Sequence, residues 1–168
     1  MSLPMMKGLD MSEVKVEIAT VEDAEDIAKI AYQVAKMHDE AMPEYFKTVA
    51  EDEQLRNIRE MLNDNKITVF KAVVAGKVCG FLFLEMIHRQ SKGLMFSKLG
   101  YVLNLGVDEV YRGQGIGTAL IAFAEKHVRE QGGEALDLNV FAFNKDAIRL
   151  YERLGYDVID VSMRKVLK

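Results

Sequence analysis

Apolar and polar residues along this chain follow two different spacings, and each predicts one kind of element. Apolar side chains alternate with polar ones through VKVEIAT and EALDLNVF, the period of two that is typical of half-buried strands. A long apolar run is interrupted by Ala75-Gly76, a short hairpin signal between two strands. The pattern therefore predicts strands over residues 14–20, 67–74, 77–87, 101–107, 134–141 and 156–168.

Helical spacing fills the segments between most of these strands. Thr20 is followed three residues later by an acid, a capping signal that begins a helix running to about residue 37. Further helices are predicted over residues 44–63, 118–133 and 144–155, the last two ending at glycines. Two hairpin strands beside a strand–helix–strand crossover imply an α/β (α+β) fold with a mixed, mostly antiparallel sheet and helices on both faces.

Length and composition indicate one globular domain. The chain has 168 residues, 49% of them hydrophobic and 29% charged, which is enough for a single core over residues 14–168. Residues 1–13 lack the apolar centre of a signal peptide and are expected to be disordered or foreign to the native chain. No window approaches the roughly 18 apolar residues that cross a bilayer, so no membrane association is predicted.

Charge and the reactive side chains narrow the function classes further. The formal net charge of −4 provides no basic field for nucleic acid, so none is expected as a partner. The single cysteine, Cys79, cannot form an internal disulfide and lies in an apolar run, which fits an inert thiol in a reducing cytoplasm. His38, His88 and His127 show no ligand spacing, so no metal site is predicted.

The chemistry is concentrated in YRGQGIGTALI, residues 111–121, where a strand leads through three glycines into a helix. A helix N-terminus exposes N–H groups that have no intrahelical partner, and its dipole favours anions. Gly113, Gly115 and Gly117 remove the Cβ atoms that would keep a diphosphate away from these groups. Arg112 adds a positive charge and Thr118 a hydroxyl, so the stretch predicts a phosphate-binding turn. The alternative is a tight turn with no ligand.

Two well-known phosphate motifs do not match this turn. The Walker pattern requires a lysine after its last glycine, where this chain has Thr118. The dinucleotide fingerprint requires G-x-G-x-x-G in the first strand–helix–strand unit, whereas the spacing here is G-x-G-x-G and occurs late in the chain.

Two segments resemble the GCN5-related N-acetyltransferases, the GNAT family. VDEVYRGQGIGTALI resembles the family's pyrophosphate motif R/Q-x-x-G-x-G/A, and LDLNVFAFNKDAIRLYERLGY resembles the segment that follows it. The order of elements matches from Val14 onward. The resemblance implies that the strands 101–107 and 134–141 splay apart and hold acetyl-CoA as co-substrate between them. The positions that it assigns to acetyl-CoA are Leu105, Gly106, Val107, Arg112, Gly113, Gln114, Gly115, Ile116, Gly117, Thr118, Asn144 and Ala147.

Some of these residues also have purely structural interpretations. Gly106 fits either a bulge or close approach by a ligand, or an ordinary packing position. Asn144 fits a contact to the co-substrate, a helix N-cap, or both.

For the reaction, the resemblance implies direct attack of an amine on the acetyl carbonyl, with Tyr151 protonating the departing thiolate. A phenol with a pKa near 10 stays protonated until that charge develops; the alternative for Tyr151 is a core aromatic. Some relatives carry a glutamate base on the strand before the glycines, but Leu103 occupies that position here. The remaining candidates to hold a proton-accepting water are Glu85, His88, Asp137 and Asn139.

The acceptor is expected to be a small amine, an amino acid or a polyamine. Asp39, Glu40 and Glu44 would suit a cationic amine, although a charged turn is commonly only solvated. The alternatives are an acetyltransferase for protein α-amines or lysines, which would need an extended peptide groove, and a non-catalytic acyl-CoA sensor. Since relatives are often dimers, the resemblance also allows a homodimer.

Overall fold

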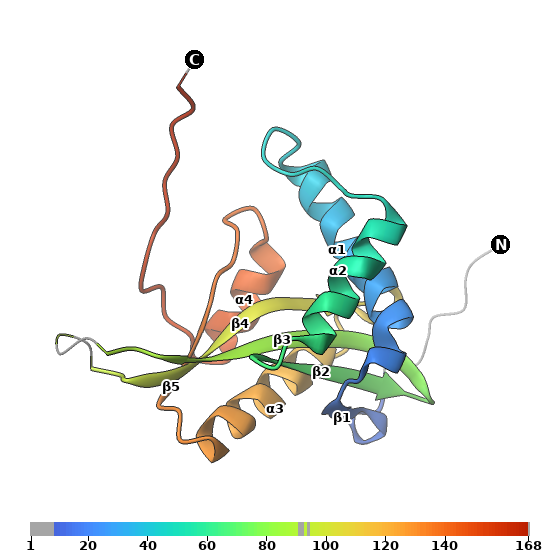
Figure 1. Ribbon diagram of the computed structural model, residues 1–168, viewed down its shortest axis with the longest axis horizontal. Coiled ribbons are helices and arrows are strands. Elements are labelled where there is room, and N and C mark those ends of the chain that lie inside the picture. The colour runs from blue at the N-terminus through green and yellow to red at the C-terminus, as the bar shows by residue number, and fades with distance from the viewer. Residues whose placement is uncertain (1–8, 91–92, 94, 168) are drawn as a thin grey trace.

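A five-stranded sheet with the strand order β1-β2-β3-β4-β5 forms the centre of the protein (Figure 1). The computed structural model describes residues 9–90, 93 and 95–167. Its strands are β1 (Lys15–Ile18), β2 (Ile67–Val74), β3 (Lys77–His88), β4 (Lys98–Val107) and β5 (Ala135–Leu138). The first four pair antiparallel and β5 pairs parallel with β4, which confirms the predicted mixed sheet.

Helices cover both faces of the sheet. They are α1 (Ala24–Ala41), α2 (Glu51–Asn63), α3 (Ile116–Glu130) and α4 (Lys145–Arg153), with short 3-10 helices η1 (Met11–Glu13), η2 (Val21–Asp23) and η3 (Glu109–Tyr111). Figure 1 shows α1 and α2 on one side of the sheet and α3 on the other. One apolar core lies under α1 and α2 around Phe81 and Phe83, and a second lies under α3 around Phe70 and Leu120. No described helix has the length and apolarity needed to cross a membrane.

Local signals located the first helix and the hairpin correctly. The Thr20 backbone N–H donates to the Asp23 carboxylate at 2.8 Å, as the predicted capping box requires. Ala75 and Gly76, between β2 and β3, both have positive φ values, 48° and 78°. A two-residue hairpin turn of this kind needs that backbone conformation.

The second helix begins seven residues later than the predicted Glu44, at Glu51. The intervening loop is held to the end of α1 by Thr48, whose backbone N–H and hydroxyl donate to the Asp39 carboxylate at 3.0 and 2.8 Å. These long-range bonds replace the helical bonds that the local pattern favoured. The same bonds engage the carboxylate of Asp39, one of the three acids that the sequence analysis considered suited to a cationic amine.

Residues 9–13 belong to the packed structure rather than lying outside it. Leu9 packs against the core beneath α3, and η1 begins with Asp10, whose side chain accepts from the Ser12 N–H at 2.9 Å. The earlier residues, 1–8, lie outside the described part of the chain. The domain boundary expected at Val14 stays a prediction.

The predicted closing strand does not pair in this structure. Across the described residues of 156–167, the chain runs in an extended path that joins no strand of the sheet (Figure 1). The last sheet strand is β5, which is also shorter than predicted. The alternating pattern of the C-terminal segment is compatible with a strand, but among the described residues the segment pairs with none of the five strands.

Candidate functional site

The two parallel strands β4 and β5 separate in the middle of the sheet. Their pairing runs from Leu99 opposite Ala135 to Val102 opposite Leu138 and stops there. β4 continues to Val107 with only β3 as its partner. Its edge beyond Val102 therefore faces away from any neighbouring strand, as the splayed pair predicted from the sequence requires.

A register shift in β4 marks the point of separation. Phe83 of β3 lies opposite Asn104, whereas Leu84 lies opposite Val102, so Leu103 is the extra residue of a bulge. The bulge is thus at Leu103 rather than at Gly106. Gly106 has a packing reason instead, because a Cβ there would lie 2.5 Å from the Phe81 ring.

A groove of about 770 Å³ fills the space between the separated strands. Its walls come from α1, the free half of β4, the glycine turn, the segment after β5, and α4. The sequence-predicted site residues that line it are Leu105, Gly106, Val107, Arg112, Gly113, Gly115, Ile116, Gly117, Thr118, Asn144, Ala147 and Tyr151. Gln114 is the exception, since its amide donates to the Val110 carbonyl at 2.9 Å and supports the turn.

The glycine turn presents backbone N–H groups to this groove. Gly113 and Gly115 have φ values of 72° and 89°, and α3 begins directly after Gly115. The first intrahelical bond is donated by Ala119 to the Gly115 carbonyl at 3.0 Å. The N–H groups of Ile116, Gly117 and Thr118 precede that bond and point out of the helix end. The turn therefore fits a diphosphate held by main-chain donors.

Arg112 is built into the turn by one of its nitrogens. Its Nε donates to the Val107 carbonyl at 3.1 Å, which ties the guanidinium to the end of β4. The residue is exposed and is one of those that line the groove. A fixed guanidinium next to free N–H groups adds a permanent positive charge to the same anion site.

Helix α4 supplies the opposite wall. The Asn144 side chain accepts from the Ala147 N–H at 3.1 Å, so the N-cap interpretation of Asn144 is confirmed, while the residue also lines the groove. One turn further on, Tyr151 is 9% exposed, and burial raises the pKa of its phenol above the ordinary value. The hydroxyl of Tyr151 therefore stays protonated across the neutral pH range.

Comparison with known proteins identifies the family. The profile of the Acetyltransferase (GNAT) family matches residues 32–156, most of the chain. This chain belongs to that family. It is 32% identical over 87 residues to the uncharacterized N-acetyltransferase YdgE of Bacillus subtilis, covering 52% of this chain and 51% of that protein. It is 31% identical over 121 residues to a mycothiol acetyltransferase of Propionibacterium freudenreichii, covering 72% of this chain and 37% of that protein.

The fold agrees with solved structures. A tetramutant of the BH1408 protein from Bacillus halodurans superposes with a TM-score of 0.84 at 24% identity, over 91% of this chain and 99% of that one. The matches thus span about half and a little over a third of the two curated relatives, but nearly all of the BH1408 chain.

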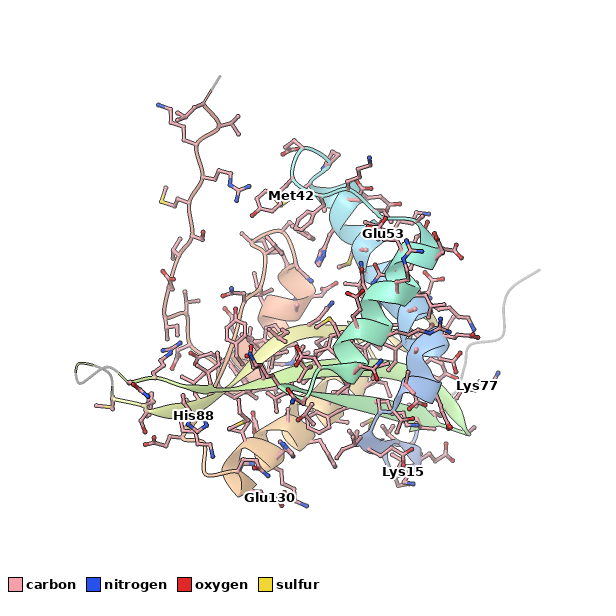
Figure 2. The ribbon with its side chains drawn as sticks, viewed as in Figure 1. Lys15, Met42, Glu53, Lys77, His88 and Glu130 are labelled. Atoms are coloured by element: carbon pink, nitrogen blue, oxygen red, sulfur yellow. The ribbon has the colours of Figure 1, made fainter. Side chains whose placement is uncertain are left out.

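Three of the four candidate bases in this GNAT chain lie away from the groove. Glu85 and His88 belong to β3 and are not among the groove-lining residues. In Figure 2, His88 lies at the lower left and Met42, the residue that follows α1, lies at the top. Asp137 pairs with Arg89 at 3.4 Å. Only Asn139 lines the groove, and its amide is not a base.

The sequence did not single out His38 as a base, yet the structure places it on the groove. It lies near the C-terminal end of α1, and burial lowers the pKa of its imidazole below the ordinary value. Its ring stacks on Phe46 at 5.1 Å and meets Phe141 and Phe143 edge-on at 5.5 and 5.4 Å. The contacts with Phe141 and Phe143 join segments about a hundred residues apart in the chain, so no local sequence pattern could predict them.

The rings around His38 bridge the two sides of the groove. We call His38, Tyr45, Phe46, Phe141 and Phe143 the aromatic cluster. Tyr45 and Phe46 follow α1, and their rings lie 5.8 and 4.8 Å from that of Phe141, which follows β5. Tyr45 and Phe141 remain 40% and 38% exposed. Of the five residues, His38 and Phe141 line the groove, so the cluster forms part of its wall.

Proposed function

We propose that this protein is an acetyl-CoA-dependent N-acetyltransferase that moves an acetyl group to a primary amine in a ternary complex. The observation that carries the proposal is one groove that joins the unpaired N–H groups of α3 to the buried phenol of Tyr151. The first would bind the diphosphate of coenzyme A, and the second lies on the opposite wall. The chain's membership of the GNAT family supports this assignment.

In the proposed reaction, each wall has a separate task. The turn from Arg112 to Thr118 holds the diphosphate and so fixes the acyl arm along the free edge of β4. N–H groups of that edge, near Leu105 and Val107, would polarise the acetyl carbonyl as oxyanion donors. As the amine nitrogen bonds to the carbonyl carbon and the carbon–sulfur bond breaks, Tyr151 gives its proton to the thiolate.

His38 is the proposed base that takes a proton from the acceptor's ammonium group, so that the neutral amine can attack the carbonyl. It is the groove-lining imidazole, and its lowered pKa leaves it neutral, hence basic, at pH 7. It would take the role of the glutamate base that some relatives carry at the position of Leu103. A base must hold its proton weakly enough to be free at working pH, and burial among apolar rings achieves this.

Replacing His38 with glutamine is expected to lower kcat/KM by about 10²-fold, the range of general-base catalysis. In the wild type, kcat/KM should fall as the pH drops through a pKa below 6.5, because protonated imidazole cannot accept a proton. The variant should lose that acidic limb. The matched control is His88→Gln, which should retain both the rate and the limb because His88 is remote from the groove. An unchanged pH profile in His38→Gln would remove His38 from the mechanism.

A small amine, amino acid or polyamine is the acceptor best supported by the aromatic cluster. A protein acetyltransferase needs an open channel for an extended peptide, whereas here the rings of Tyr45 and Phe46 lie against that of Phe141, which lines the groove. Exposed ring faces also attract cations. The guanidinium of Arg164 already lies 4.2 Å from the Tyr45 ring centroid. The mycothiol acetyltransferase relative is named for a small acceptor.

The direct test is thiol release from acetyl-CoA in the presence of an amine panel. The panel contains monoamines, amino acids, polyamines, and peptides with a free α-amine or a lysine. Turnover with the small amines is expected, and turnover with peptides alone would transfer the assignment to protein acetylation. Tight binding of coenzyme A without turnover on any acceptor would instead favour the non-catalytic sensor.

A further inference from the structure

Three large apolar residues line the groove and stay partly open to solvent. They are Leu103, Val140 and Phe141, each 37% or 38% exposed. The ring centroid of Phe141 lies 5.5 Å from that of His38, so this apolar surface begins beside the proposed base. Apolar side chains that gather in a groove, rather than singly over the surface, are typical of a site that buries an apolar part of its ligand.

The charges of the groove wall are mostly positive. Among the described residues that line it, Asp146 carries the one carboxylate, and that group pairs with Arg149. Arg112 and Arg153 also line the groove. A polyamine keeps at least one ammonium group besides the one that is acetylated, and removing that group from water is costly unless it is paired. The wall therefore favours an acceptor with a single positive charge.

The acids at the end of α1 do not add a carboxylate to this wall. The Asp39 carboxylate accepts the two hydrogen bonds from Thr48. Glu40 lines a separate pocket of about 380 Å³, where its carboxylate lies 3.9 Å from the Lys36 ammonium. Glu44 is not among the groove-lining residues. The three acids that would suit a cationic amine therefore lie outside the groove wall.

The position of His38 decides which part of an acceptor meets the rings around it. As the proposed base, its imidazole needs the acceptor nitrogen within hydrogen-bond reach. The rings of Phe46, Phe141 and Phe143 lie between 5.1 and 5.5 Å from that imidazole. The carbon atoms next to the acceptor nitrogen must therefore pass along aromatic rings. Among these three phenylalanines, Phe141 is the one that also lines the groove, so it is the ring that the acceptor can contact directly.

We propose that the acceptor is an arylalkylamine, a primary amine with one positive charge and an aromatic ring a short carbon chain away from the nitrogen, and that this ring packs on Phe141. This acceptor class rests on the proposed function and narrows it from small amines in general. Edge-on or offset packing of the substrate ring would extend the aromatic cluster and cover the exposed part of Phe141. Phe141 then determines specificity, while His38 and Tyr151 keep their proposed roles.

The first measurement compares three amines on the wild type by thiol release from acetyl-CoA. The value of kcat/KM should be at least about tenfold higher for 2-phenylethylamine than for butylamine, because only the former buries a ring in the groove. 1,4-Diaminobutane should be the poorest acceptor, because its second ammonium group finds no free carboxylate among the described groove-lining residues. Equal kcat/KM values for 2-phenylethylamine and butylamine, or a preference for the diamine, would overturn the proposal while leaving the proposed enzymatic activity intact.

The second measurement compares Phe141→Ala with the matched control Phe96→Ala. The two residues are 38% and 43% exposed, and Phe96 is not among the groove-lining residues. Phe141→Ala should raise KM for 2-phenylethylamine about tenfold and change that for butylamine by less than about twofold. Phe96→Ala should change neither. Since Phe141 also touches His38, an equal loss of activity with both amines would show that the ring acts through the base, and it would refute the specificity role.

Calorimetry separates this acceptor class from the proposed activity. Each amine is titrated into the complex of the protein with coenzyme A, in which no acetyl group can be transferred. The dissociation constant of 2-phenylethylamine should be about tenfold below that of butylamine, and Phe141→Ala should remove the difference. Absence of turnover with every amine would refute the proposed function alone, since the titration would still detect a site for the aromatic ring. Equal binding of the three amines would refute that site.

Discussion

Replacing Gly115 with valine is expected to raise the dissociation constant of coenzyme A by at least about 100-fold. Gly115 has a φ of 89° and immediately precedes the free N–H groups of α3. A side chain there would occupy the approach to those donors, and a bound anion gains about 1.5–3 kcal/mol from each such bond. Loss of two bonds alone corresponds to roughly 100-fold in affinity. Isothermal titration with coenzyme A measures the change.

Two controls separate the loss of the ligand site from damage to the turn. Gly132 has a similar φ of 74° near the other end of α3, so Gly132→Val carries the same backbone strain, about 1–2 kcal/mol, away from the groove. It should lower the melting temperature but leave the affinity for coenzyme A unchanged. In addition, a Cβ on Gly115 would lie 2.7 Å from the Met11 sulfur. If Gly115→Val/Met11→Ala regains affinity, displacement of the N-terminal segment was the cause, and the proposed cradle is wrong.

The parts of the fold that the sequence predicted well depend on residues close together in the chain. The capping box at Thr20 and the hairpin turn at Ala75-Gly76 are decided within a few residues, and both occur as expected. The glycine turn is local in the same way. Its three glycines and the helix after them lie in one short stretch, so a candidate anion site could be predicted without knowing what packs around it.

Long-range contacts explain what the sequence left out. The late start of α2 follows from the bonds of Thr48 to Asp39, and the bulge at Leu103 follows from the pairing of β4 with β3. His38 reaches the groove because it packs against Phe141 and Phe143 from the far end of the domain. The pairing of β4 with β3 and the contacts of His38 join segments that are too far apart in the chain to be predicted from one short window of sequence.

The C-terminal segment, residues 157–167, has the sequence pattern of a strand but is not part of a strand in the structure. The alternation after Tyr156 predicted a strand, but the described residues of 156–167 form none. The sequence pattern indicates which side chains of a segment are suited to burial, whereas strand pairing depends on which sheet edge the segment can reach. The exposed apolar side chains of this segment could therefore be recognised only once the sheet order was known.

Removing one hydroxyl, in Tyr151→Phe, is expected to lower kcat by about 10²- to 10⁴-fold, the contribution of a positioned general acid. The affinity for coenzyme A should remain within about twofold, because the ring still fills its place in the groove wall. Burial raises the pKa of the Tyr151 phenol, so the alkaline fall of the wild-type rate should begin only as the pH rises through that raised pKa. The variant should lose this alkaline limb. Steady-state kinetics from pH 6 to 11 measure both effects.

Tyr156→Phe is the matched control for this substitution. The Tyr156 and Tyr151 rings lie 5.9 Å apart in the same core, but the Tyr156 hydroxyl donates to Glu125, and Tyr156 is not among the groove-lining residues. Its removal should cost about 1 kcal/mol of stability and leave kcat nearly unchanged. If both variants slow the reaction equally, or if Tyr151→Phe weakens coenzyme A binding as much as it slows turnover, then Tyr151 acts by packing. The proton would in that case reach the departing thiolate by another route, such as a water in the groove.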